Sequence, residues 1–212
     1  MKKLSDIREH YNKGNLLRSE LLDDPYLQFD LWMKQAIDSE CLHPTAVNLA
    51  TVDSQLRPST RIVLLKEVSD EGFVYFTNYK SQKGSELEQS SFACLNFFWA
   101  ELERQVRISG EVKKVEPAKS DEYFQSRPRE SQLGAWASEQ SSLVKTSEDL
   151  QARYNELEKQ YEGKNIPRPE HWGGYVLMPN KIEFWQGRSN RMHDRYLYTL
   201  EANTWKIEQL AP

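Results

Sequence analysis

The chain has 212 residues, a length that suits one large domain or two small ones. Lys and Arg number 28 against 32 Asp and Glu, and the formal net charge of −4 argues against a nucleic acid as the main partner. Apolar residues make up 38% of the chain, enough for a core, yet no apolar run approaches the roughly 18 residues of a transmembrane helix. With no secretory signal visible, we expect a soluble cytoplasmic protein without membrane contacts.

The N-terminal segment, residues 1–24, is rich in charge and poor in apolar residues, so it is predicted to be a mobile arm. The remaining residues, 25–212, are predicted to form a single domain. The first helix begins at the Asp24-Pro25 pair, which is typical of an N-cap and a first turn. The spacing predicts an apolar stripe on this helix, made by Leu27, Leu31, Ala36 and Ile37.

From residue 46 onward, short segments rich in β-branched and aromatic residues predict strands. The predicted strands are 46–52, Arg61–Lys66, Gly72–Thr77, Phe92–Trp99, Arg104–Val115, Gly174–Trp185, His193–Leu200 and Thr204–Leu210. Helices are predicted at Pro117–Arg127, at Ser131–Ser138 and from Ser147 to a stop at Gly163. This order indicates a mainly β chain with peripheral helices, an α+β fold built on an antiparallel barrel or sandwich.

The motifs of the commonest cofactor and metal sites are absent from the sequence. There is no glycine-rich phosphate loop, no HExxH or CxxC motif and no GxSxG nucleophile. The two cysteines are too few for a disulfide framework, and the four histidines are scattered, so no metal site is predicted. A bound anion would have to be held by side chains, which makes cations within apolar or aromatic segments the candidates.

The first candidate is the strand from Arg61 to Lys66, which carries a cation at each end. Five residues is an odd separation, so an unbulged strand points the two side chains to opposite faces. A buried strand with solvated ends explains this segment equally well.

The second candidate combines Tyr123, Arg127 and Ser131. The four-residue spacing places Tyr123 and Arg127 on one helix face, and Pro128 then turns the chain before Ser131. A phenol, a guanidinium and a hydroxyl that converge make a phosphate clamp. The alternative is a solvated helix end with Ser131 as an N-cap, which the local pattern alone favours.

The third candidate follows Trp185, where a turn at residues 187–190 precedes residues with strand alternation. Alternation places Arg191, His193 and Arg195 on one face, where they repel one another unless an anion or a carboxylate lies among them. A face paired with neighbouring acids is the alternative. Trp185 offers an aromatic surface beside the cations and slightly favours a binding site.

A series of motifs runs in order along the chain: Arg61-Ile-Val-Leu-Leu-Lys66, Glu103-Arg-Gln-Val106, Ser126-Arg-Pro-Arg129, Ser131-Gln-Leu-Gly-Ala-Trp136, Ser138-Glu-Gln-Ser141, Trp172-Gly-Gly174, Ile182-Glu-Phe-Trp-Gln-Gly187, Arg191-Met-His-Asp-Arg195 and Leu210-Ala-Pro212. In this order, over about Ile7 to Pro212, the sequence resembles the pyridoxine/pyridoxamine 5′-phosphate oxidase family.

The resemblance implies an FMN-binding antiparallel split barrel that works as a homodimer, with two FMN sites at the subunit interface. It also implies oxidation of pyridoxamine or pyridoxine 5′-phosphate to pyridoxal 5′-phosphate, with O2 as electron acceptor and H2O2 as product. FMN contacts would fall on Arg61, Ile62, Val63, Leu64, Leu65, Lys66, Phe76, Thr77, Lys83, Gln105, Gln140, Ser141, Trp185 and Arg195. Substrate contacts would fall on Arg8, Tyr11, Lys66, Tyr123, Arg127, Ser131, Arg191 and His193, with Arg8 and Tyr11 at positions that can close over the substrate.

One position departs from the family pattern. The family usually has an Arg-Lys pair where this chain has Gln82-Lys83, so one cation is missing from the expected flavin-phosphate region and Gln82 is not assigned as a ligand.

Two phosphorylated ligands would explain why isolated cations lie inside strands and helices without a glycine loop. Lys66 and the Tyr123 clamp suit the substrate phosphate, and Arg61 and Lys83 suit that of FMN. The catalytic positions are assigned to Arg191 and His193, which would hold the pyridine over the flavin and aid proton loss, although positioning alone could suffice. The alternatives are a split-barrel flavin oxidoreductase for another small substrate and a non-enzymatic module that binds flavin or single-stranded nucleic acid.

Overall fold

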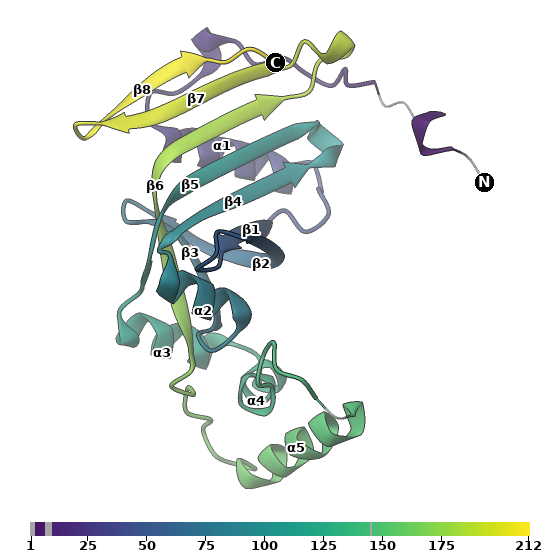
Figure 1. Cartoon of the computed structure of the whole chain (residues 1–212), viewed down its shortest axis with the longest axis vertical. Helices are drawn as coiled ribbons and strands as arrows, with labels where there is room; N and C mark the ends of the chain where they lie inside the picture. Colours follow the sequence, from purple (N-terminus) through teal and green to yellow (C-terminus); the bar gives the residue numbers. More distant parts are fainter. Residues whose placement is uncertain (1–2, 7–9, 145) are drawn as a thin grey trace. The chain divides into compact units, whose positions relative to one another are not determined.

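The structure, a computed structural model, describes residues 3–6, 10–144 and 146–212. The helices are α1 Pro25–Asp38, α2 Gln82–Gln89, α3 Pro117–Ser126, α4 Arg129–Ala137 and α5 Ser147–Gln160 (Figure 1). The strands are β1 Ala46–Val52, β2 Pro58–Ser69, β3 Gly72–Asn78, β4 Phe92–Trp99, β5 Arg104–Lys114, β6 Trp172–Gln186, β7 Asp194–Glu201 and β8 Thr204–Gln209. Among the residues described, no helix combines the length and the apolar character needed to cross a bilayer.

The strands form a sheet in the order β3-β2-β1-β4-β5-β6-β7-β8, and β3 also pairs with β6. This extra pairing closes six strands into a barrel and leaves β7 and β8 as an extension. The pairing of β3 with β6 is antiparallel, with Tyr75 opposite Tyr175, and so is that of β6 with β7, with Trp185 opposite Arg195. The predicted mainly β fold, an antiparallel split barrel with peripheral helices, is confirmed.

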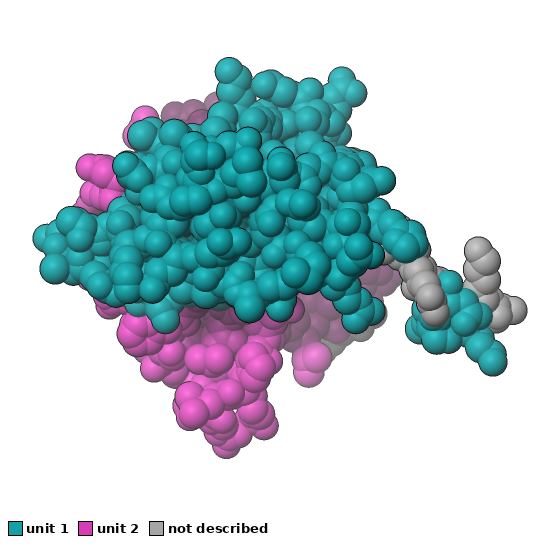
Figure 2. All heavy atoms as spheres, turned by 90° about the horizontal axis from the view of Figure 1, so that it is seen from above, with its two compact units in different colours: residues 1–49, 94–110, 179–212 teal, residues 50–93, 111–178 magenta. Residues whose placement is uncertain are grey.

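The chain divides into two compact units, which are coloured separately in Figure 2. Unit 1 comprises residues 1–49, 94–110 and 179–212, and unit 2 comprises residues 50–93 and 111–178. The boundary between the units cuts four strands, β1, β4, β5 and β6, so that each unit contains part of every one of them.

The core of unit 1 is built from aromatic rings. Phe29 on α1 meets Phe97 on β4 at 5.1 Å between ring centroids, and Trp32 meets Phe184 on β6 at 5.2 Å. Tyr198 on β7 completes the cluster, 5.4 Å from Phe184. Edge-to-face aromatic pairs of this kind add to the stabilisation that burial of the rings provides.

The buried face of α1 differs from the predicted stripe. The helix begins after Asp24 as predicted, and this carboxylate accepts the Tyr26 N–H at 2.8 Å. Phe29, Trp32 and Ala36 are buried, because the large rings bury more apolar area than the leucines would. The exposed positions include three of the predicted stripe, Leu27, Leu31 and Ile37.

Unit 2 has its own core beside the barrel strands. Phe124, Leu133, Ile166 and Trp172 are buried together, and helices α4 and α5 pack against each other beside them. The helix predicted from Ser147 is α5, which ends at Gln160. Tyr154 and Leu157 on this helix, and Tyr161 directly after it, are partly buried against the cluster.

Helix α2 was not predicted, because the stretch from Asn78 to Gly84 has the composition of a connection. Its start is fixed by Ser81, whose side chain accepts the Gly84 N–H. A Cβ at Gly84 would lie 1.9 Å from the Tyr79 carbonyl oxygen, so only glycine permits this close approach.

The strand alternation predicted for residues 191–195 is wrong, because β7 begins only at Asp194. Asn190 and Arg191 adopt left-handed backbone conformations, with φ of 57° and 61°. The Met192 N–H donates to the Ser189 carbonyl at 3.1 Å and closes a turn. The Arg191 and His193 side chains are therefore presented by a turn and not by a strand.

Candidate functional site

A cavity of about 530 Å³ lies within unit 2 and is lined by polar and aromatic side chains. The residues that the sequence assigned to the substrate phosphate all line this cavity: Lys66, Tyr123, Arg127 and Ser131. Five residues assigned to FMN line the same cavity: Leu64, Lys66, Phe76, Thr77 and Gln140, of which Lys66 also belongs to the substrate set.

Strand β2 delivers Lys66 to this cavity through its alternation. Val63 and Leu65 are buried, whereas Leu64 and Lys66 lie on the other face and line the cavity. Arg61 lies on the same face of β2 as Val63 and Leu65, where it donates to Glu86. Arg61 and Lys66 therefore point to opposite faces of the strand, as predicted.

The sequence around Pro128 positions the next part of the cavity. Helix α3 ends at Ser126, and Arg127 is extended, with φ of −73° and ψ of 149°, as the residue before a proline prefers. Helix α4 starts at Arg129 directly after Pro128, so Ser131 lies in its first turn. The alternative interpretation of Ser131 as an N-cap is therefore wrong, because Pro128 occupies the cap position.

Arg127 is held over an aromatic surface, and no carboxylate of the described residues pairs with it. Its guanidinium carbon lies 4.5 Å from the ring centroid of Trp172 and 5.6 Å from that of Phe124. Among the described residues, no group accepts a hydrogen bond from the buried Nη1 atom. Burial lowers the pKa of Arg127, partly offset by Tyr123. A buried donor on a fixed cation favours an anion in the cavity.

A stack of aromatic rings forms one wall of the cavity. Tyr123 stacks on Phe76 with centroids 3.9 Å apart, and Trp172 lies nearly parallel to both, at 6.2 Å from Tyr123 and 5.6 Å from Phe76. Flat apolar walls with a few convergent polar groups are typical of sites for aromatic small molecules.

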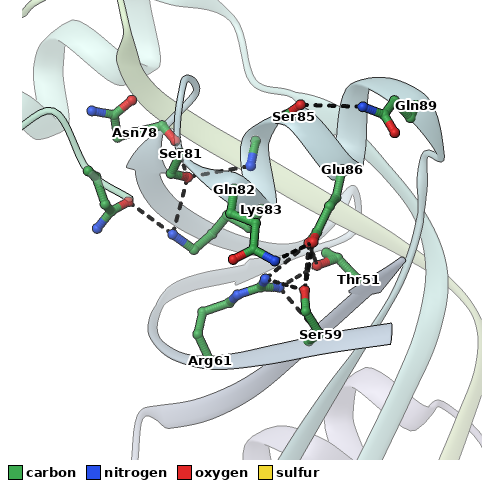
Figure 3. A network of polar contacts seen from close by, with 12 residues as sticks. Thr51, Ser59, Arg61, Asn78, Ser81, Gln82, Lys83, Ser85, Glu86 and Gln89 are labelled. Atoms are coloured by element: carbon green, nitrogen blue, oxygen red, sulfur yellow. Dashed lines mark hydrogen bonds and ion pairs between the residues drawn. The ribbon is translucent and has the colours of Figure 1, made fainter. Parts of the chain in front are cut away.

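Lys83 lies in the first turn of α2 and is 6% exposed. Its Nζ donates to the neutral oxygens Ser81 Oγ, at 3.3 Å, and Gln140 Oε1, at 2.9 Å (Figure 3). Within the described part of the chain, no carboxylate forms an ion pair with it. Burial and the charge of Arg61 lower the pKa of Lys83 to about 8, against the opposing effect of Glu86. A buried ammonium with these partners is suited to an anionic ligand.

Glu86 is the centre of a second network on α2, in which Arg61 takes part (Figure 3). Its carboxylate accepts hydrogen bonds from Arg61 Nη2 at 3.0 Å, from Gln82 Nε2 at 2.8 Å, from Ser59 at 2.7 and 2.8 Å, and from Thr51. Burial alone would raise the pKa of Glu86, but these hydrogen bonds outweigh it and lower the pKa. Gln82 therefore directs its amide to a carboxylate.

The C-terminal candidate residues lie in unit 1, on and after β6. The Trp185 ring is 4.7 Å from that of His193, and Tyr11 packs edge-on against both, at 5.6 and 5.7 Å. Arg191 is exposed in the turn, while His193 is half-buried. Three groups that the sequence assigned to substrate or FMN thus share one aromatic cluster.

The ring of His193 is oriented by the backbone. Its Nδ1 accepts the Arg188 N–H at 3.1 Å, and a backbone N–H can only donate, so the neutral imidazole carries its proton on Nε2. Burial lowers the pKa of His193, and the charges of Arg191 and Arg195 add to this effect, with Asp194 opposing. At neutral pH the ring is an uncharged donor at Nε2.

Arg195 is fixed by a buried carboxylate and by the C-terminal segment. Its Nε donates to Glu183 Oε1 at 2.8 Å, and its Nη1 donates to the Ala211 carbonyl at 2.8 Å. Arg107 also donates to Glu183, which is 3% exposed. Burial would raise the pKa of Glu183, but the hydrogen bonds from Arg195 and Arg107 outweigh it and lower the pKa.

The remaining predicted residues are less informative. Gln105 is half-buried on β5, and Ser141 is exposed with a left-handed backbone, φ 72°, beside Gln140. Ile62 is 65% exposed on β2. Arg8 lies outside the described residues.

Comparison with known proteins gives the family. Residues 33–162 match the family model described as pyridoxamine 5′-phosphate oxidase, and residues 172–212 match the model described as pyridoxine 5′-phosphate oxidase C-terminal dimerisation region. The chain belongs to the pyridoxamine 5′-phosphate oxidase family of enzymes. The resemblance inferred from the motifs is thereby confirmed.

Relatives and solved structures of the family agree. Pyridoxine/pyridoxamine 5′-phosphate oxidase of Cyanothece sp. is 53% identical over 99% of this chain and 98% of its own length, and that of Paraburkholderia phymatum is 53% identical over the whole of both chains. The structure of PhzG from Burkholderia lata, in complex with tetrahydrophenazine-1-carboxylic acid, is 30% identical, with a TM-score of 0.89 over 95% of this chain and 100% of that chain. An FMN-binding protein from Nostoc punctiforme shares the fold at 16% identity, with a TM-score of 0.70 over 89% of this chain and 98% of that chain.

Sequence reasoning missed several residues that organise these sites. Trp172 was quoted only as part of a motif, although it carries the Arg127 guanidinium. Glu86 gave no signal beyond its helical spacing from Gln82, because the helix itself was not predicted. Glu103 was also quoted only in a motif, and the structure shows its carboxylate accepting hydrogen bonds from the N-terminal arm.

Proposed function

We propose that the chain oxidises pyridoxamine 5′-phosphate and pyridoxine 5′-phosphate to pyridoxal 5′-phosphate in vitamin B6 metabolism, using FMN, with O2 as electron acceptor and H2O2 as product. The observation that carries the proposal is the unit 2 cavity. In it, the buried Nη1 of Arg127, which finds no hydrogen-bond partner in the described part of the chain, is joined by Lys66, Tyr123 and Ser131. Two cations and two hydroxyls around one space suit a phosphate dianion.

The rest of the cavity suits a phosphorylated pyridine. Phe76, Tyr123 and Trp172 offer parallel aromatic rings next to the cations, so an aromatic ring and its phosphate can be held together. The charged groups fix the position of the substrate, and the flat wall fixes its orientation.

FMN fits the described residues as a cofactor. Lys83 is a buried ammonium with neutral partners, and Arg61 is fixed nearby by Glu86, so a flavin phosphate would be held by these two cations. The further candidates for flavin contacts are Thr77, Gln140, Trp185 and Arg195, together with the other residues that the resemblance assigns to FMN. Bound FMN would accept the hydride that leaves C4′ of the substrate and pass the electrons to O2.

Arg191 and His193 are proposed to bind and orient the substrate. The Nε2–H of neutral His193 is available to donate to an oxygen of the pyridine substrate, because Nδ1 is already used by the backbone. This favours a positioning role for His193 over that of a general base. Arg191 supplies a positive charge from the adjacent turn, Ser189–Arg191, and does not belong to a strand.

We propose that the active form is a homodimer with shared flavin sites. The support is the match of residues 172–212 to a dimerisation region. Light scattering on FMN-loaded protein tests this proposal, and a stable, fully loaded monomer would refute it.

The function is tested by the visible spectrum of the purified protein, followed by aerobic assay with pyridoxamine 5′-phosphate. We expect a yellow protein that produces pyridoxal 5′-phosphate and H2O2. Pyridoxamine without its phosphate is the matched control and should react poorly. Turnover of an unphosphorylated ring compound, with none of pyridoxamine 5′-phosphate, would favour a flavin oxidoreductase for another small substrate.

A further inference from the structure

A carboxylate attaches the N-terminal arm to the rest of unit 1. Glu103 Oε2 accepts the backbone N–H groups of two successive arm residues, Asn12 at 2.7 Å and Lys13 at 2.9 Å. The side chains of Asn12 and Lys13 are exposed, so this part of the arm is not held by burial. Hydrogen bonds from backbone N–H groups to an ionised carboxylate are stronger than those between neutral groups.

Glu103 joins the arm to the segment that follows β6. It is 7% exposed and lies between a short turn, Ala100–Leu102, and β5. Its backbone oxygen accepts the Gly187 N–H at 2.7 Å and Gln186 Nε2 at 3.3 Å. One residue therefore holds the arm with its side chain and the Gln186–Gly187 segment with its backbone.

The attachment places Tyr11 directly beside the aromatic cluster of the candidate site. Tyr11 packs edge-on against Trp185 and His193, at 5.6 and 5.7 Å. A Cβ at Gly187 would lie 2.9 Å from Cβ and Cγ of Tyr11, so the arm approaches this glycine too closely for any side chain. Tyr11 directly precedes the pair of residues whose N–H groups Glu103 binds.

A second carboxylate holds the arm a few residues later. Asp194 Oδ2 accepts the Leu16 N–H at 2.9 Å and also pairs with Arg188 at 2.8 Å. Leu16 is 5% exposed, so burial secures this end of the arm as well. Next to Tyr11, the arm is held by the two hydrogen bonds to Glu103 and by an exposed one from Lys13 Nζ to the Glu101 carbonyl at 2.8 Å, so the carboxylate of Glu103 supplies the backbone attachment of this stretch.

We propose that Glu103 is a positioning residue that fixes the arm at Asn12 and Lys13, so that Tyr11 is held against Trp185 and His193 and helps to retain the substrate. The link to substrate rests on the proposed function, whereas the attachment itself does not. Tyr11 and His193 are the groups that would contact the substrate, and Glu103 acts through Tyr11.

Hydrogen exchange of the protein without added substrate tests the attachment. Glu103→Asn replaces the carboxylate with a shorter, uncharged amide that does not reach the arm. Asn suits the left-handed backbone of this position, φ 54°, so the fold is retained. Glu103→Gln keeps an acceptor oxygen at the same place. We expect the Asn12 and Lys13 amides to exchange roughly tenfold faster in Glu103→Asn, with partial protection restored in Glu103→Gln.

Glu111→Gln is the matched control, because Glu111 lies on β5 and its carboxylate pairs with Lys113 at 3.8 Å and, among the residues described, with no arm residue. The Leu16 amide is an internal reference, since Asp194 holds it. Unchanged exchange at Asn12 and Lys13 in Glu103→Asn would overturn the attachment, whatever the enzyme oxidises.

Steady-state kinetics with pyridoxamine 5′-phosphate tests the positioning role. We expect Glu103→Asn to raise KM about fivefold with kcat within about twofold of wild type, Glu103→Gln to recover most of the loss, and Glu111→Gln to behave as wild type. Gly187→Ala should raise KM in the same way, because the new Cβ would lie 2.9 Å from Cβ and Cγ of Tyr11 and 3.1 Å from Cβ of Glu103 and would displace both side chains. Faster amide exchange without any change in KM would show that the attachment does not serve the site. A wild-type protein without oxidase activity would instead refute the proposed function and leave the exchange result standing.

Discussion

Replacement of Lys83 by Met should affect the stability of the FMN-free protein and its affinity for FMN in opposite directions. Lys83 is 6% exposed, and burial together with Arg61 lowers its pKa from 10.5 to about 8. At pH 7 the side chain is charged in the folded and the unfolded states, and the fold therefore carries the full cost of burying the charge. A shift of this size corresponds to about 3 kcal/mol.

The sign follows from the lowered pKa. The cost is complete below pH 8, decreases as the pH rises from about 8 toward the unfolded value of 10.5, and is absent above it. Met fills a similar volume without a charge, so Lys83→Met should stabilise the FMN-free protein at pH 7 by about 1–3 kcal/mol, or several degrees in Tm. The advantage of the variant should disappear by about pH 10.5.

FMN binding should respond in the opposite way, because the variant has lost a cation for the flavin phosphate. A charge-assisted hydrogen bond contributes roughly 1.5–3 kcal/mol, so Kd for FMN should rise about 10- to 100-fold. Wild-type affinity should fall as the pH rises above about 8, where Lys83 of the FMN-free protein loses its proton, and the variant should lack this dependence. Flavin fluorescence titration and thermal melts of the apoprotein at pH 7 and 10 measure both effects. A destabilised apoprotein with unchanged FMN affinity would refute the reasoning.

Three further predictions concern the substrate. Arg127→Met should raise KM for pyridoxamine 5′-phosphate at least about tenfold and lower thermal stability only slightly, since among the described residues Nη1 has no hydrogen-bond partner to lose and the guanidinium gives up only its contact with the Trp172 and Phe124 rings; an equal loss with unphosphorylated pyridoxamine would contradict a phosphate contact. Arg191→Met should keep bound flavin and lower kcat/KM about 10- to 100-fold, and it should raise the pKa of His193, measured by NMR, because the Arg191 charge helps to lower it. His193→Asn should lower kcat/KM less than Arg191→Met does and leave the shape of the pH–rate profile unchanged; a flattened acidic limb would instead identify a proton-transfer role.

The parts of the fold that depend on local chemistry could be predicted from the sequence. The helix before Pro128 ends where proline excludes helical backbone at Arg127, and this brings Tyr123, Arg127 and Ser131 to one cavity. The opposite orientation of Arg61 and Lys66 follows from strand alternation alone. These are short-range rules, and they position most of the unit 2 cavity.

The parts that depend on distant contacts could not be predicted. The hydrogen bonds from Asn12 and Lys13 to Glu103 join residues about 90 positions apart, and no local pattern indicates them. The turn at Asn190 and Arg191 requires left-handed backbone at a non-glycine pair, which alternation cannot reveal. The arm attachment and the orientation of His193 therefore emerge only from the folded structure.

The departure at Gln82 is accommodated by Glu86. Where the family usually has a second cation, the Gln82 amide donates to the Glu86 carboxylate, and the same carboxylate holds Arg61 (Figure 3). A phosphate near α2 would therefore meet Arg61 already paired with an acid and Lys83 with neutral partners. Because an unpaired buried cation gains more from an incoming anion than a paired one does, Lys83 should contribute most to holding the flavin phosphate in this chain.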